Sequence, residues 1–111
     1  MMRTSTSAII ARNETWTGEA ATEPYEAGWA KEAIIFVRSL KAPSGPQVRA
    51  RVEISPDGMN WAPEGAEIPL PDRKDAVTFA RVSHFGTWLR LAATLPEDSA
   101  NTVLVTIHLK S

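Results

Sequence analysis

The fold of this chain is decided by the run Val48-Arg49-Ala50-Arg51-Val52-Glu53-Ile54, which leads directly into Ser55-Pro56-Asp57-Gly58-Met59-Asn60-Trp61. Apolar and polar side chains that alternate in this way indicate a β-strand with one buried face. The strand must then turn, because proline presets the first turn angle and glycine accepts the positive φ that follows. Trp61 lies just past the turn, and we expect its ring to fold back onto the sheet and into the core. The stretch therefore predicts a small all-β domain.

Extended segments of the same character recur along the chain, whereas helical periodicity is hard to find. They span residues 7–12, 14–17, 32–40, 47–54, 67–70, 76–82, 88–95 and 102–110. Turns rich in proline, glycine, aspartate and serine separate them. Seven or eight short strands at this spacing predict a single antiparallel β-sandwich, either jelly-roll or immunoglobulin-like in topology.

The 111 residues, of which 43% are hydrophobic, are enough for one domain with its own core. We expect residues 31–111 to form the sandwich and residues 1–30 to form an extended N-terminal arm. Residues 13–30 contain four glutamates and no lysine or arginine, whereas the next segment, 31–51, is mostly basic. This contrast suggests that the arm contacts a neighbouring molecule through Trp16 and Trp29.

Composition argues against several classes of protein. A net charge of −1 is unlike that of a dedicated nucleic-acid binder, and the absence of cysteine excludes disulfides and thiolate metal sites. The histidines, His84 and His108, lack the spacing of metal ligands, so we expect no metal and no cofactor. No run approaches the roughly 18 apolar residues of a membrane span, and the N-terminus lacks the apolar stretch of a signal peptide. We therefore expect a protein of the cytoplasm or of a virion or other particle, with no membrane partner.

Signals of catalysis are weak. The Gly-x-Ser-x-Gly motif of serine hydrolases is missing from the chain, and no cysteine can replace the serine as nucleophile. Glu64 and Glu67 resemble a pair of catalytic carboxylates, but a sandwich of this size offers little cleft between them. The sequence therefore predicts a protein that is not an enzyme.

The aromatic residues carry the binding signal. Alternation along the 88–95 strand places Trp88 and Arg90 on its outer side, and Arg49 and Arg51 join them if the 47–54 strand lies in the same sheet. Guanidinium groups stacked on indole stabilise such a surface by about 0.5–1 kcal/mol, so we take these four residues as the candidate interaction face. The same pattern also fits a solvated sheet face without a partner. Exposed tryptophans that stack on sugar rings would instead make the protein a carbohydrate-binding module.

Several of these features occur together in one known group of proteins. In the order of these segments the chain resembles small β-sandwich proteins of phage and prophage-like clusters. The segments are an apolar strand at 33–37, Ser-Pro-Asp-Gly-x-x-Trp at 55–61, Trp-Leu-Arg at 88–90 and a terminal alternating strand at 102–109. The resemblance covers about residues 30–110. It implies a non-catalytic structural or accessory binding role, in which the protein associates with itself or decorates a capsid or shell.

Overall fold

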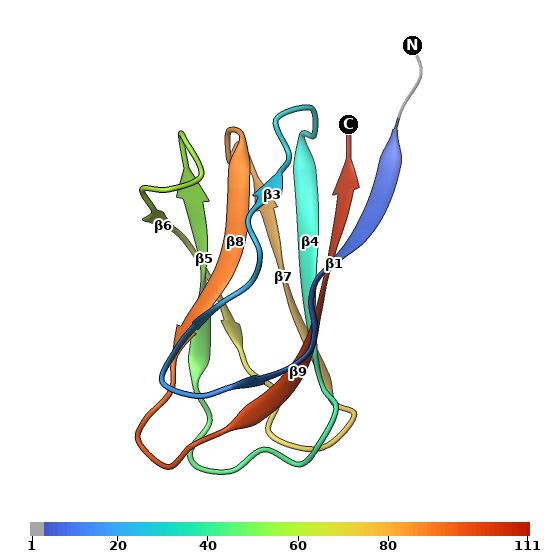
Figure 1. Ribbon diagram of the computed structural model, residues 1–111. Helices are drawn as coiled ribbons and strands as arrows, with labels where there is room; N and C mark the ends of the chain where they lie inside the picture. Colours follow the sequence, from blue (N-terminus) through green and yellow to red (C-terminus); the bar gives the residue numbers. More distant parts are fainter. Residues whose placement is uncertain (1–3) are drawn as a thin grey trace.

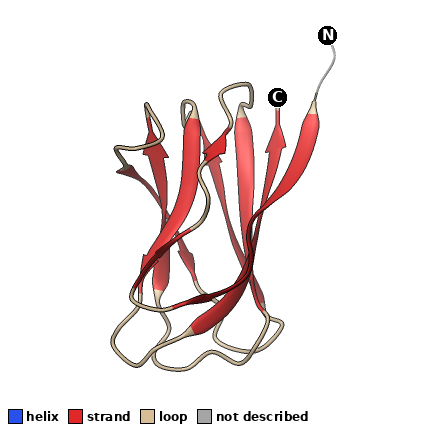
Figure 2. Cartoon of the chain, in the orientation of Figure 1, coloured by secondary structure: helices blue, strands red, loops and turns tan. Residues whose placement is uncertain are grey.

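The computed structural model describes residues 4–111, which form two packed antiparallel sheets and contain no helix (Figures 1 and 2). The strands are β1 (Ser5–Trp16), β2 (Glu19–Ala21), β3 (Tyr25–Glu26), β4 (Glu32–Ser39), β5 (Arg49–Ser55), β6 (Ala62–Pro69), β7 (Val77–Ser83), β8 (Trp88–Thr94) and β9 (Asn101–Lys110). The predicted all-β sandwich is therefore confirmed.

The order of the strands decides between the two topologies that the sequence left open. The four-stranded sheet has the order β1-β9-β4-β7, and the five-stranded sheet has the order β2-β8-β5-β6, with β3 also paired to β8. First and last strands pair, as do β2 and β3 with β8, β4 with β7, and β5 with β6. A chain paired in this nested way is one long ribbon wound around a core, which is the jelly roll.

The core lies between the two inner faces and follows the alternation of the sequence. Ile35 and Val37 of β4, Leu89 and Leu91 of β8, and Ile107 of β9 are fully buried. Their neighbours along each strand point outward, because successive side chains of a strand alternate between the two faces of a sheet. The outer face of each sheet is thus formed by the residues that the core does not use.

The turn at 55–61 closes the hairpin between β5 and β6 as predicted. Gly58 has a φ of 80°. The hydroxyl oxygen of Ser55 accepts a hydrogen bond from the amide of Gly58 at 2.8 Å. The carboxylate of Asp57 accepts hydrogen bonds from the amides of Met59 and Asn60 at 2.9 and 2.8 Å. These local bonds hold the pKa of the Asp57 carboxyl well below its usual range, since they favour the charged form.

The N-terminal segment differs from expectation. The structure places β1, β2 and β3 inside the two sheets rather than in a separate arm of residues 1–30, of which residues 1–3 lie outside the described part. β1 pairs with β9 along most of its length, and register shifts near Ala11 and Asn13 turn Ile10, Ala11 and Trp16 toward the core. These apolar side chains complete the core, which explains why the segment packs on its own chain.

Candidate functional site

The four residues of the predicted interaction face do share one surface. Arg49 and Arg51 lie on β5, and Trp88 and Arg90 lie on β8, which is its neighbour in the five-stranded sheet. The register between these strands places Trp88 opposite Ser55. We call the outer surface of this sheet the charged face.

The charged face is not a free basic surface. The buried carboxylate of Glu53 accepts hydrogen bonds from Arg51 at 3.0 Å and from Arg90 at 2.7 Å. On the same surface Arg49 pairs with Glu67 at 3.1 Å, and Arg51 lies 3.8 Å from Glu19. Each of the predicted arginines therefore meets a carboxylate of its own chain. The expected basic character is lost because Glu53 shares the outer face of β5 with Arg49 and Arg51, and because Glu67 of β6 and Glu19 of β2 lie beside them.

The protonation of Glu53 follows from this arrangement. Burial alone would raise the pKa of its carboxyl, but the hydrogen bonds from Arg90 and Arg51 outweigh burial and hold the pKa below the usual range. Glu53 is thus a carboxylate that stays ionised between two cations. Such a group ties β5 to β8 and is poorly suited to accept a proton at neutral pH.

Aromatic rings cover part of this network. The guanidinium of Arg90 lies 4.3 Å from the centre of the Trp61 ring. Trp61 is therefore half-buried on the outer side of the sheet, and the expectation that it fills the core is wrong. Trp88 is also half-buried, because the turn at Gly58 packs against its indole ring. The stacking partner of Arg90 is thus Trp61, which the 55–61 turn places over the guanidinium group.

The four tryptophans lie in four different surroundings. Trp16 belongs to the core, which removes it from contact with any neighbouring molecule. Trp29 is exposed in the loop between β3 and β4. Within residues 4–111 no two of the four indole rings stack on one another. The paired tryptophan platform on which sugar stacking would rely is not formed by direct ring contacts.

The outer surface of the four-stranded sheet was not singled out from the sequence. Its most exposed apolar residues are Val77 and Phe79 of β7 and Ile9 of β1, which are 54%, 46% and 43% exposed. Between them lie the partly buried side chains of Ile34, Phe36 and Leu104. We call these six residues the apolar face. The sequence did contain a signal for this surface, because Val77 and Phe79 are apolar at outward positions that alternate with the inward-facing Thr78 and Ala80.

Aromatic and cationic groups meet on the apolar face. The Phe36 ring contacts Phe79 at 5.8 Å and His108 edge-on at 5.1 Å between ring centres. Arg81 extends over the Phe79 ring at 5.1 Å, and within residues 4–111 no carboxylate forms a salt bridge with it. This surface therefore presents rings and an available guanidinium to the solvent.

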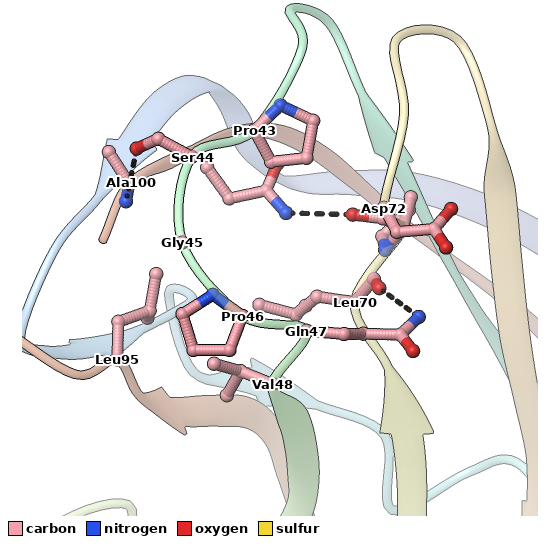
Figure 3. A pocket seen from close by; sticks show the side chains of 12 residues that line it. Pro43, Ser44, Gly45, Pro46, Gln47, Val48, Leu70, Asp72, Leu95 and Ala100 are labelled. Carbon is pink, nitrogen blue, oxygen red and sulfur yellow. Dashed lines mark hydrogen bonds between the residues drawn. The ribbon is translucent and has the colours of Figure 1, made fainter.

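A small hollow lies at the end of the sandwich opposite the 55–61 turn, between the loops around residues 43–48, 70–72 and 95–101 (Figures 1 and 3). Its volume of about 30 Å³ accommodates no more than one or two water molecules. Side chains bridge the loops: Gln47 donates to the carbonyl of Leu70 at 2.9 Å, and Asn101 donates to that of Pro71 at 3.1 Å. The hollow therefore joins the loops and offers no room for an organic substrate.

Within residues 4–111 no three histidine, aspartate or glutamate side chains are grouped as metal ligands would be. The same part of the chain has no helix with the length and apolarity needed to cross a membrane.

Comparison with known proteins bears on the fold. No protein-family model matches this chain, and no curated protein matches it in sequence. Among solved structures, the crystal structure of the SPBc2 prophage-derived protein YomS is similar, with a TM-score of 0.61 and 11% identity over 100% of this chain and 96% of that one. At this identity the likeness establishes a shared fold over the whole chain. The likeness between the two proteins is therefore one of fold.

Proposed function

We propose that this chain is a non-catalytic structural protein that self-associates through its apolar face, as a building unit or as a decoration of a larger particle such as a capsid or shell. One observation carries the proposal: three of the five exposed large hydrophobic side chains of residues 4–111 lie on this single surface. Contiguous exposed apolar patches on small proteins mark interaction sites, because leaving them in water is unfavourable.

The contrast with the charged face supports this choice of surface. There the arginines are neutralised by carboxylates of the same chain, so a partner would have to break ion pairs in order to bind. On the apolar face, in contrast, a partner would remove Val77, Phe79 and Ile9 from water without such a penalty. The fold shared with a prophage-derived protein agrees with a role in the cytoplasm or on a virion.

Light scattering coupled to size exclusion, over a range of protein concentrations, tests the proposal. We expect the wild-type protein to associate, and Phe79→Glu to weaken association about tenfold or more, because a charge would replace a central apolar contact. Met59→Glu is the matched control, because Met59 is the most exposed hydrophobic residue yet lies in the 55–61 turn, away from the apolar face. A wild-type protein that stays monomeric at millimolar concentration would contradict the proposal, as would equal effects of the two variants.

A further inference from the structure

The edges of the two sheets differ in how they are protected against pairing with another chain. An edge strand exposes unpaired amides and carbonyls, and proteins usually block it with proline, bulges or very short strands. β6 contains Pro63 and Pro69, and β1 contains register shifts and a positive φ at Asn13. β2 and β3 have only three and two residues, and Pro24 lies between them. Three of the four edges are therefore poor templates for a further strand.

β7 is the remaining edge, and it is regular. Its sequence, Val-Thr-Phe-Ala-Arg-Val-Ser, contains no proline, glycine or lysine. It pairs with β4 through seven consecutive residues, from Val77 to Ser83, without a register shift. β-Branched and aromatic residues of this kind favour extended pairing. Unlike the other edges, β7 therefore keeps the geometry that a further strand requires.

The free hydrogen-bonding groups of β7 can be assigned residue by residue. The amide of Ser39 donates to the carbonyl of Ala76 at 3.2 Å. Because bonding alternates along an antiparallel strand, Thr78 and Ala80 bond inward to β4, whereas Phe79 and Arg81 direct their amides and carbonyls away from it. Within residues 4–111 no strand pairs with this outer side of β7. The open backbone groups thus belong to residues whose side chains lie on the outer surface of the sheet.

We propose that β7 is the joint between two copies of this chain, and that it pairs antiparallel with β7 of the second copy about a two-fold axis at Phe79. The proposal rests on the proposed self-association and assigns it to the β7 edge of the apolar face, so that Ile9, at the opposite edge of the sheet, would stay outside the contact. The two four-stranded sheets would then form one continuous sheet, with the two Phe79 rings side by side on its surface. Aromatic pairs across antiparallel strands are favourable, by about 0.2–1 kcal/mol relative to alanine pairs.

Charge complementarity selects a second copy as the occupant of this edge. With Phe79 opposite its counterpart, Arg81 lies opposite Val77 of the second copy. Asp75 of that copy belongs to the turn two residues before β7 and has a φ of 66°, so it lies at the end of the strand that Arg81 faces. Arg81 has no carboxylate partner in its own described chain, and Asp75 retains acceptor capacity beside Arg38. The two-fold arrangement would bring each Arg81 toward the turn that carries Asp75 of the other copy.

Cysteine crosslinking tests the geometry directly, because the chain has no cysteine of its own. In a strand pair centred on residue 79 the two Cα atoms would be about 5.5 Å apart, which suits a disulfide. Phe79→Cys is expected to form a covalent dimer under mild oxidation. Ile9→Cys is the control, because β1 is the opposite edge of the same sheet. Equal or preferential crosslinking of Ile9→Cys would overturn the pairing, since it would indicate that the apolar faces stack on one another.

A second pair of variants distinguishes the contribution of the β7 backbone to association from that of the Arg81 side chain. Arg81→Pro removes an amide that faces the open edge, and it leaves the bonds between β7 and β4 in place. Arg81→Ala removes the side chain and keeps that amide. We expect Arg81→Pro to weaken association by about tenfold or more, since two hydrogen bonds are lost per dimer, and Arg81→Ala to weaken it less. Thermal melting of both variants is compared with that of the wild type, so that unfolding is recognised.

The possible outcomes distinguish this inference from the proposed function. If both Arg81 variants associate like the wild type while Phe79→Glu is monomeric, the apolar face mediates association and pairing through β7 is wrong. If the wild-type protein itself is monomeric, self-association fails and the β7 joint fails with it. If Arg81→Pro is monomeric, remains folded and Arg81→Ala still associates, the edge of β7 is the joint.

Discussion

The outer faces of the two sheets differ in whether their side chains find partners within the same chain. On the charged face, Glu53 and its two arginines are half-buried or buried, and each of them meets an opposite charge of the same chain. On the apolar face, Val77 and Phe79 remain about half exposed, even though Arg81 extends over the Phe79 ring. The conspicuous arginines thus mark a surface that is already satisfied. A surface is thus available for binding when its groups lack partners, whatever its charge.

Among variants that test this difference between the faces, we expect Glu53→Ala to have the largest effect on the free energy of unfolding. The substitution leaves Arg51 and Arg90 without their shared acceptor beneath Trp61. Because both guanidinium groups retain some contact with water, we expect a loss of about 2 kcal/mol in the free energy of unfolding, less than for a fully buried pair. Urea denaturation measures this loss.

Glu67→Ala is the matched control for that variant. Glu67 also pairs with an arginine of β5 on the same face, but both side chains are more than half exposed. We expect its removal to change the free energy of unfolding by less than about 0.5 kcal/mol. Equal losses for the two variants would show that the burial of Glu53 does not set the charged face apart.

A smaller effect is expected from acid. The pKa of Glu53 is lowered in the folded protein, so around the ordinary value of 4.5 the unfolded chain binds more protons at this site than the folded one. The stabilisation by Glu53 is therefore complete above that value and is lost as the pH falls through the lower pKa of the folded state. Unfolding free energies measured at a series of acidic pH values should decline less steeply for Glu53→Gln than for the wild type. Parallel curves would contradict this assignment.

Much of the fold was predictable because the interactions that define it are local. The alternation of β4, β5, β8 and β9 fixes which side chains face the core, and the Pro-Asp-Gly turn positions Gly58 at a positive φ. β1 was harder, since its register shifts interrupt the period of two. Counting by twos from Ala11 therefore fails to place Trp16 in the core, although both side chains are buried, and the segment resembles an arm when read by itself.

The candidate sites were less predictable because they depend on neighbours across strands. Placement of Arg51 and Arg90 on one outer face followed from periodicity alone. Periodicity also places Glu53 beside Arg51, whereas the contact of Glu53 with Arg90 and the position of Trp61 over Arg90 follow from strand order and from the bend of the 55–61 turn. The apolar face shows the same dependence, since Ile9 and Phe79 share a surface only because β9 and β4 lie between β1 and β7.

The smallest effect is expected from Asp75→Asn, and it isolates the role of burial. The Arg38–Asp75 pair at the rim of the four-stranded sheet is 2.8 Å long and the Arg90–Glu53 pair is 2.7 Å long, but the carboxylates are 54% and 9% exposed. Arg38 lowers the pKa of Asp75, yet water screens this pair, so we expect no measurable change in the free energy of unfolding. Asparagine also tolerates the φ of 66° at this position. The measurement is made at low protein concentration, where association does not contribute. A loss as large as that of Glu53→Ala would mean that ion-pair geometry, and not burial, distinguishes the two faces.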